Sequence, residues 1–587
     1  MKKIFIAGLL TVGALASCND FLDIAPKDKF TDTPEYWDNP TNLEYQCNLF
    51  YEDYLGYGNG GGKGWFYYKT LGDDQVDFQK NDWTWTSAPA TSSDWEDAYE
   101  SIRHANFILQ RLATSGMEEG SKASFQGIAR LNRAWQFYQL VRMYGDVPLV
   151  YVVPDHHSNE ILYGPRVDRD VVMDSVVADL KFATQHITGS NKQRFTKNMA
   201  YAMLADVALY EGTYCKYRTA ADNAGKGPNL ERAKTYLNTC VEACKVIMDN
   251  KDFILNDSYQ ALYNSTDLSK STEIIFYKPY SRNTLMHSLI DYTVNTGGTN
   301  GMTKDAFDNY LFLDGKPLVT TSLDNSDEGK MVVVDVKKKI DGVMKTVKDT
   351  SYNINNLLAV RDKRLAATVD TVLAFKGSSY SRAGSDAFTS TTAYGIAKYD
   401  NTQELSTNDR NNINRQYTDA PVYWLAVIYL NYAEAKAELG TITQDDLDKS
   451  VNLLQRRAGL PNMTLTPDAD PANNMGVSNL LWEIRRTRRC ELMCDNWYRY
   501  WDLIRWHQLE LVDSKTHPNI YLGANMSMVE NPQVELYAPN KATPWIVYMV
   551  GSNTTKQVRT YDKKYYFYPI PTGQKALNGK LEQNPGW

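Results

Sequence analysis

The sequence is poor in the features that mark membrane-spanning, metal-binding and nucleic-acid-binding proteins. Beyond residue 18 it contains no apolar run of 18 residues, whereas a membrane-spanning helix needs about 20. Its 587 residues include only 7 Cys and 7 His, and the net charge of -7 is mildly acidic. An acidic chain lacks the positive surface that binds nucleic acid. We therefore expect neither a transmembrane helix nor a nucleic-acid partner.

Motifs of common enzyme classes and metal sites are missing as well. The chain has neither a glycine-rich phosphate loop nor a nucleophile elbow. Two cysteine pairs have i,i+4 spacing, Cys240 with Cys244 and Cys490 with Cys494, which places each pair on one face of a predicted helix. Neighbours on one turn seldom meet disulfide geometry, and no histidine lies at zinc-ligand spacing beside them. We predict small buried side chains there, no metal site and no cofactor.

The first eighteen residues have the pattern of a lipoprotein export signal. Lys2 and Lys3 precede a mostly apolar run over residues 4–15, which is too short to span a bilayer. The LASC sequence that ends at Cys18 resembles a bacterial lipobox, so residues 1–17 are predicted to be removed and Cys18 to carry the lipid. The alternative is an ordinary secretory signal in which Cys18 is incidental. Both interpretations place the protein outside the cytoplasm.

Amphipathic helices dominate much of the chain. Residues 94–114 and 124–144 show the three-and-four spacing of apolar side chains. On the second of these helices, at least two of Trp135, Tyr138 and Leu140 should be buried against the neighbouring helix pair. Similar helix pairs recur at roughly 30–40 residues, as in tetratricopeptide-like repeats, and the pattern returns after residue 420.

These patterns predict a mostly α-helical fold: a tetratricopeptide-like helical-repeat scaffold with a loop-rich ligand-binding part and few short strands. Residues 18–90 would form an anchored segment with a candidate ligand loop, and residues 91–250 the first part of the scaffold. Residues 251–420 would be a loop-rich substrate-binding insertion, and residues 421–587 the second part of the scaffold.

Three polar clusters resemble functional sites but have simpler structural explanations. Residues 483–491 hold a dense set of Arg and Glu, which on a helix predicts salt bridges and a solvated face rather than an anion site. His156 and His157 lie in a turn-like segment, which favours a surface loop over a metal site. Asp73 and Asp74 could be half of a glycosidase carboxylate pair, although the sequence does not fix the separation of about 5–9.5 Å that such catalysis needs.

Longer motifs carry a family resemblance. The chain contains CNDFLDIAPKD from residue 18, YGDVPLVY at 144–151, RRTRRCELMCDNWYRYWDLIRW at 485–506 and YYFYPIPTGQKALNGKLEQNPGW at 565–587. Each motif alone is only a loose pattern. Their order along nearly the whole chain resembles the SusD/RagB family of outer-membrane nutrient-binding lipoproteins from Bacteroidetes.

The resemblance implies a partner, a membrane location and no enzymatic activity. The partner would be a SusC-like TonB-dependent outer-membrane transporter, over which the lipoprotein lies as a lid. The ligand in such proteins is most often a glycan and in some members a peptide. Asp20 and Asp23 are similar to the acidic residues that send these lipoproteins to the cell surface. We therefore expect a protein anchored by lipid in the outer membrane and facing the cell exterior.

Two stretches are candidates for the ligand site. Indole and phenol rings can pack against the C–H faces of sugars, while carboxylate and amide groups bind hydroxyls. In the aromatic, glycine-rich stretch 56–87, the candidate contacts are Trp65, Tyr67, Asp73, Asp74, Asn81, Trp83 and Trp85. In the stretch 280–302 they are Tyr280, Arg282, Tyr292 and Asn295, beside glycines that let a backbone approach a ligand. The alternative is that half or more of the rings in the first stretch belong to the core.

The sequence therefore predicts a cell-surface protein that captures an oligosaccharide or polysaccharide and delivers it to its transporter. A peptide-binding member of the same family is one alternative. A surface glycoside hydrolase is another, which the release of sugar products would reveal. A pure protein-interaction scaffold is the third, and it predicts no affinity for any oligosaccharide.

Overall fold

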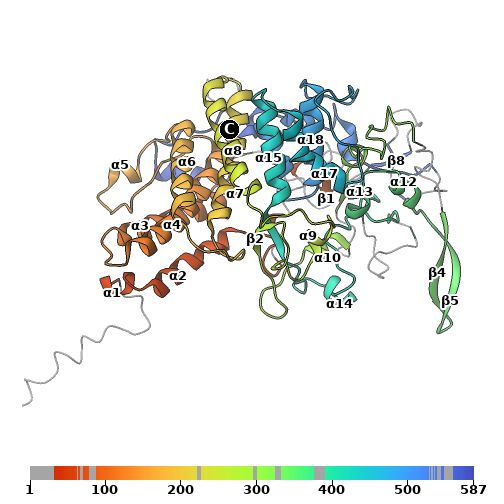
Figure 1. Cartoon of the computed structure of the whole chain (residues 1–587), viewed down its shortest axis with the longest axis horizontal. Coiled ribbons are helices and arrows are strands. Elements are labelled where there is room, and N and C mark those ends of the chain that lie inside the picture. Colours follow the sequence, from red (N-terminus) through yellow and green to blue (C-terminus); the bar gives the residue numbers. More distant parts are fainter. Residues whose placement is uncertain are drawn as a thin grey trace, which may run out of the picture.

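The computed structural model is built mainly from α-helices, with short two-stranded sheets (Figure 1). It describes residues 32–61, 64–65, 71–77, 87–220, 226–294, 300–323, 332–375, 378, 390–496, 498–527, 529, 533–534, 536–537, 544–547 and 559–587. The predicted signal and Cys18 lie outside these residues. The expected fold class, a mostly helical repeat scaffold with few short strands, is confirmed.

The first half of the scaffold is a row of helices in which each long helix packs on the next, in the order α3, α4, α6, α7 and α8. Residues 94–114 and 124–144, predicted to be helical, correspond to α3 and α4. Helix α4 begins earlier than expected because the Glu118 carboxylate accepts hydrogen bonds from the first-turn N–H groups of Gly120 and Ser121. The elements are α1 (Pro34–Trp37), α2 (Pro40–Asn48), η1 (Leu49–Asp53), α3 (Ser93–Leu112), α4 (Glu119–Tyr144), α5 (Asn159–Leu162), α6 (Arg169–His186), α7 (Lys197–Tyr217) and α8 (Leu230–Met248).

The expected burial on α4 is confirmed. Trp135, Tyr138 and Leu140 are all buried, and the Tyr54 ring stacks on Trp135 with centroids 5.4 Å apart. Offset-stacked rings of this kind add to the stability that burial already gives.

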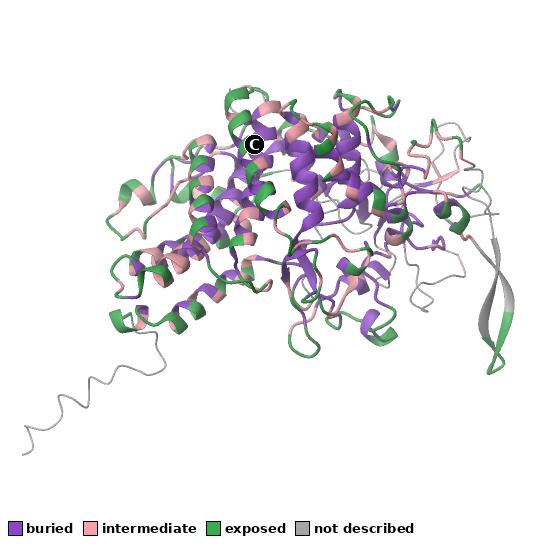
Figure 2. Cartoon of the chain, viewed as in Figure 1, coloured by how far each residue is buried: buried purple, intermediate pink, exposed green. Residues whose placement is uncertain are grey.

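The second half of the scaffold joins the first through α15, which packs against α7, α8 and α18. Helix α15 is buried along nearly its whole length (Figure 2). The elements are α15 (Leu425–Glu438), α16 (Gln444–Asp448), α17 (Val451–Arg457), α18 (Asn479–Glu491), α19 (Tyr498–Arg505), η3 (Leu509–Val512), η4 (Pro518–Tyr521), β7 (Leu522–Asn525), β8 (Trp545–Val547), η6 (Lys563–Tyr566) and α20 (Thr572–Leu577).

The prediction of a solvated face on residues 483–491 is wrong, although the predicted salt bridges are present. Every residue of α18 from Leu481 to Glu491 is buried. Its arginines pair with carboxylates that other segments bring to the helix from several sides. These pairs are Arg485 with Glu438 (2.9 Å), Arg486 with Asp470, Arg488 with Asp502 (2.8 Å) and Arg489 with Asp74 (2.7 Å). The sequence does not show which distant acids will surround this helix. The many charged side chains of residues 483–491 therefore pointed to a solvent-exposed face, although they are buried in ion pairs.

The middle of the chain contains short helices and most of the strands. In the described residues the sheets pair β1 with β3, β2 with β6, β4 with β5, and β7 with β8, all antiparallel. The VVVDV run at 332–336 forms the first part of β4. The elements are β1 (Gln75–Asp77), α9 (Ala261–Asn264), β2 (Ile274–Lys278), α10 (Leu289–Val294), β3 (Asn300–Met302), α11 (Lys304–Asp308), β4 (Val332–Ile340), β5 (Val343–Ser351), α12 (Asn355–Ala359), α13 (Lys363–Thr368), α14 (Thr407–Arg410) and β6 (Ala420–Trp424).

The cysteine predictions are confirmed for burial and partly wrong for helix position. Cys240 and Cys244 lie on α8 with their sulfur atoms 3.9 Å apart, and both are buried free thiols. Cys490 and Cys494 are also buried, but α18 ends at Glu491 and Cys494 has a φ of 62°, so this pair does not share one helix face. Among the helices of the described residues, none is long and apolar enough to cross a membrane.

Candidate functional site

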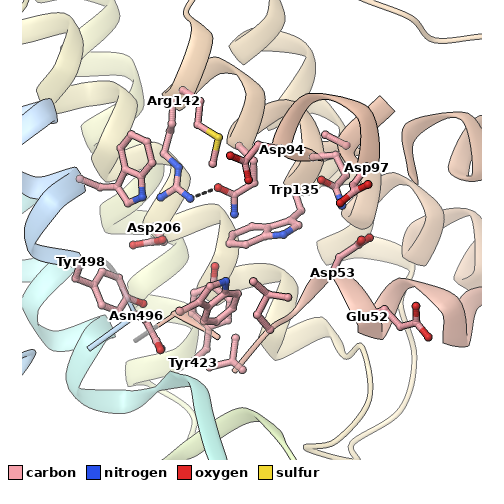
Figure 3. Close-up of a pocket in the computed structure, with 18 residues that line it drawn as sticks. Glu52, Asp53, Asp94, Asp97, Trp135, Arg142, Asp206, Tyr423, Asn496 and Tyr498 are labelled. Carbon is pink, nitrogen blue, oxygen red and sulfur yellow. Dashed lines mark hydrogen bonds between the residues drawn. The ribbon is translucent and has the colours of Figure 1, made fainter. Parts of the chain in front are cut away.

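A pocket of about 200 Å³ lies where the two halves of the scaffold meet (Figure 3). Its walls come from η1, α3, α4, α7, β6 and α19, together with the loop that follows η1. Its aromatic lining consists of Trp65, Trp135, Tyr423, Tyr498 and Trp501, and its acidic lining of Glu52, Asp53, Asp94, Asp97 and Asp206. The pocket therefore combines flat apolar rings with an excess of negative charge.

Helix α4 forms one wall of the pocket through Trp135, Gln139 and Arg142. Positions spaced by three and four residues share one face of a helix, so these side chains reach the cavity together. The Arg142 guanidinium lies 4.3 Å from the Tyr138 ring centroid and 4.5 Å from that of Trp501. One of its N–H groups donates to the Gln139 side-chain oxygen, while its buried Nε has no hydrogen-bond partner among the described residues.

The carboxylates of the pocket differ in the number of hydrogen bonds that they accept from the protein. Asp53 accepts hydrogen bonds from Ser101 Oγ (2.7 Å) and Asn132 Nδ2 (2.9 Å), and burial raises its pKa. Asp94 and Asp206 accept no hydrogen bond from the described residues. Burial, and then the charge of Asp97, raise the pKa of Asp94 to about 6, and burial also raises the pKa of Asp206. The charges of Arg488, Arg142 and Arg505 oppose the shift at Asp206, so Asp94 is the pocket acid that the described residues leave without a compensating cation.

The pocket is not arranged as a metal site. In the described part of the chain, one group of possible ligands lies within 4.8 Å, namely Asp170, Glu211 and Cys215, and it lies outside the pocket. Arginines already occupy that group, because Arg169 pairs with Glu211 (2.6 Å) and Arg218 with Asp170 (2.7 Å). No three carboxylates of the described pocket lining converge within 4.8 Å of one another.

Replacing Asp94 by asparagine should stabilise the ligand-free protein near neutral pH. The folded-state pKa of about 6 exceeds the ordinary value of 3.8, so the charged carboxylate disfavours folding above pH 6, and this penalty disappears as the pH falls through 6 toward 3.8. We expect a gain of about 1–3 kcal/mol in the free energy of unfolding at neutral pH, measured by urea denaturation, and none at about pH 4. Glu96→Gln, at an exposed position on the same helix, should change stability by less than about 0.5 kcal/mol. A less stable Asp94→Asn protein at neutral pH would contradict this assignment.

The structure places the described candidates of stretch 56–87 in different environments. Trp65 lines the pocket and is 8% exposed. Asp73 and Asp74 are buried, with Asp73 bound by Arg499 at 2.6 and 2.7 Å and Asp74 by Arg489 at 2.7 Å. The remaining candidates lie outside the described residues: Tyr67, Asn81, Trp83 and Trp85.

The candidate residues of stretch 280–302 also lie in different environments. The Tyr280 side chain is buried, and its hydroxyl donates to the Gly58 carbonyl (2.6 Å). Arg282 is exposed and pairs with Asp409 (3.2 Å), and Tyr292 is half-buried at the end of α10. Asn295 lies outside the described residues. Strands β1 and β3 pair, with Gln75 opposite Met302, so the two candidate stretches lie against each other.

Most of the pocket was not recognised in the sequence. Trp135 was predicted as a core residue, and Arg142, Asp94 and Asp206 were not considered as site residues. One feature of the sequence could have indicated the pocket. Gln139 and Arg142 are polar and share a helix face with Trp135, whereas a face that packs entirely in the core would be apolar. The contributions of α7, β6 and α19 had no local signal, since these elements meet only in the folded chain.

The scaffold and its pocket define a helical-repeat protein with a deep aromatic and acidic cavity. The chain belongs to the SusD family, whose model matches residues 251–587, more than half of the sequence. A second model, described as "Starch-binding associating with outer membrane", matches residues 69–209.

Individual relatives are distant. A SusD-like protein of Bacteroides ovatus is 23% identical over 327 residues, which cover 51% of this chain and 55% of the relative. The chain thus spans about half the length of that relative. A solved SusD-like carbohydrate binding protein from Bacteroides fragilis superposes with a TM-score of 0.69 at 21% identity, covering 93% of this chain and all of that one. A laminarin binding SusD-like protein superposes with a TM-score of 0.53 at 18% identity, covering 94% of this chain and all of that one. These likenesses establish the fold.

Proposed function

We propose that this protein is a cell-surface glycan-binding lipoprotein that passes its ligand to a SusC-like TonB-dependent transporter in the outer membrane. Membership of the SusD family, and the glycan ligands named for two of its structural neighbours, support this proposal. The lipobox at Cys18 supports attachment to the membrane. A binding protein held beside its transporter acts at a high effective concentration, so weak affinity is sufficient.

The observation that carries the proposal is the combination of side chains in the pocket. Tyr498 and Trp135 offer rings to the apolar face of a sugar, and Asp206 and Gln139 offer groups that bind hydroxyls. Trp65, the described ring of the candidate loop that reaches the pocket, connects this cavity to the stretch 56–87. We therefore propose that the pocket and that stretch form one ligand surface, in which Asp73 and Asp74 have no direct part.

The geometry of Asp73 argues against a glycosidase acid at that position. Although burial alone would raise the pKa of Asp73, the charges of Arg489 and Arg499 hold it well below its ordinary value. A general acid needs a raised pKa to hold its proton near neutral pH. We propose binding without hydrolysis, and incubation with the bound glycan should release no sugar products.

Calorimetry on the form that begins after Cys18 tests the function, with ligands first chosen from a glycan array. Asp206→Ala should weaken binding of the selected glycan at least tenfold, about 1.4 kcal/mol, because a hydrogen bond to a charged group is lost. Glu242→Ala removes a carboxylate from an exposed position on α8 and is the matched control. The double variant Trp83→Ala with Trp85→Ala should weaken binding by a similar factor if the stretch 56–87 shares the site. Binding of peptides but of no glycan on the array would favour the peptide-binding alternative.

A further inference from the structure

We propose that the pocket selects glycans that carry a protonated amine, such as hexosamine units without an N-acetyl group. This inference rests on the proposed glycan-binding function and narrows its ligand class. It comes from the charge of the cavity, from the partners its carboxylates lack, and from the position of those carboxylates relative to the Trp135 ring.

The charge of the pocket is strongly one-sided. Among the described residues, five carboxylates line it, of which Glu52 and Asp97 are exposed to solvent, and Arg142 is the one cationic side chain. Arg142 forms no ion pair with the described residues and is surrounded instead by the rings of Tyr138 and Trp501. The cavity therefore attracts positive charge, and a neutral sugar would leave that charge uncompensated.

Several fully buried carboxylates elsewhere in the described part of the chain are paired with arginines, although Asp419 is bound by backbone N–H groups instead. Glu434 is bound by Arg505 at 2.6 and 2.7 Å, and Asp73 by Arg499 at similar distances. Asp94, in contrast, receives neither a hydrogen bond nor a cation from the described residues, and its nearest charged influence is the carboxylate of Asp97. Asp94 is half-buried and Asp97 is exposed on the next turn of α3, so water screens part of their repulsion. A cation bound beside both would relieve the rest.

The geometry favours an organic cation attached to a sugar ring. No three carboxylates of the described pocket lining lie within 4.8 Å of one another, as noted above, so they suit a bulky charge better than a metal. Figure 3 shows Asp97 and Asp206 on opposite sides of the Trp135 ring, with Asp94 and Arg142 above the ring in this view. An ammonium group bound by Asp94 and Asp97 would place its sugar ring against the exposed part of the indole that Tyr54 does not cover, where a nearby positive charge is also favourable. Gln139 and Arg142 would then donate hydrogen bonds to ring or hydroxyl oxygens.

The test compares three tetramers that carry an amine, an acetylated amine or a hydroxyl at the same position of each sugar unit. The probes are the β-1,4-linked tetramer of glucosamine, its fully N-acetylated counterpart and the matching glucose tetramer, titrated calorimetrically near neutral pH and low ionic strength. We expect the amine-bearing tetramer to bind at least tenfold more tightly than either of the other two. In Asp94→Asn with Asp97→Asn this preference should fall to less than threefold. The matched control, Glu96→Gln with Glu100→Gln, removes two exposed charges from the same helix and should keep the preference.

Acidification provides a second readout. The affinity for the amine-bearing tetramer should decrease as the pH falls below 6, where its amines are already protonated and Asp94 becomes neutral. The neutral tetramers should show no such change. The titratable and charged groups that face Asp94 across the pocket are Glu52, Asp53, Asp97, Arg142 and Asp206, together with the phenols of Tyr423 and Tyr498.

The possible results separate this inference from the proposed function. If acetylated, neutral or acidic glycans bind as tightly as amine-bearing ones, the amine preference is overturned while glycan binding stands. If no glycan of any class binds, both fail. If a lysine-containing tetrapeptide binds at least tenfold more tightly than the glucosamine tetramer, and Asp94→Asn with Asp97→Asn removes that binding, the pocket serves a cationic peptide and the inference is also overturned.

Discussion

Replacing Glu434 by alanine should lower the free energy of unfolding by about 3–5 kcal/mol. The Glu434 carboxylate accepts two hydrogen bonds from Arg505, at 2.6 and 2.7 Å, and one from Trp506 Nε1 at 2.7 Å. All three side chains are buried. Removing the acid would leave the Arg505 guanidinium with Asp502 as its remaining ionic partner and would leave the Trp506 N–H unsatisfied in the interior. A thermal or urea melt would measure the loss.

An exposed ion pair provides the control for this variant. Lys449 and Asp445 pair on the surface with side chains 64% and 70% exposed, so Asp445→Ala should change stability by less than about 1 kcal/mol. Similar losses in the two variants would show that burial does not govern the strength of the Glu434 network.

The pH dependence of the same network has a definite sign. Burial alone would raise the pKa of Glu434, but Arg505, Arg488 and Arg485 lower it to about 2. A lowered folded-state pKa gives stability that is present above the ordinary value of about 4.5 and is lost as the pH falls toward 2. Acid should therefore destabilise the natural protein more than Glu434→Ala, and the two stability curves should approach each other below about pH 3.

Replacing Cys18 by alanine should move the protein from the membrane fraction to the aqueous phase. The only attachment that the sequence provides is the predicted lipid on Cys18, and the acyl chains contribute about 0.8 kcal/mol per buried CH₂ group. Labelled fatty acid should be incorporated into the natural protein and not into the variant. Detergent phase partitioning measures the change in location.

Two further measurements keep this prediction decisive. A form whose residues 1–18 are replaced by an ordinary secretory signal avoids retention through an uncleaved leader and should be released in the same way. Its melting curve should match that of the natural protein, because Cys18 precedes every helix that the structure describes. Firm membrane association of this form in cells without a SusC-like transporter would defeat the lipid-anchor hypothesis.

The helical scaffold could be predicted because its signal is local. The apolar spacing in residues 94–114 and 124–144 gave α3 and α4 to within a few residues, and it also gave the burial of Trp135 and Tyr138. Amphipathic periodicity of this kind depends only on neighbours three and four positions apart. The error at the start of α4 arose from a Glu118 cap, whose side chain is not one of the preferred capping residues.

The candidate site was predicted less well because its parts are far apart in the sequence. Asp94 and Asp206 carry no local pattern that distinguishes them from other acids on amphipathic helices. The sequence analysis placed Asp73 and Asp74 beside a ligand. In the structure both are buried and paired with Arg489 and Arg499, which lie more than 400 positions away in the sequence. An exposed acid and a buried, paired acid are identical in sequence until the partner is known.

The sequence by itself predicted an export signal and determined the helical character and the family motifs of this protein, because each of these depends on short or ordered runs of residues. The tertiary structure alone decided which charges are buried and paired, and which carboxylates remain without a cation around the pocket. The physical reason is that the free energy of a charge depends on its surroundings in space, and those surroundings are assembled from helices that the chain brings together only on folding.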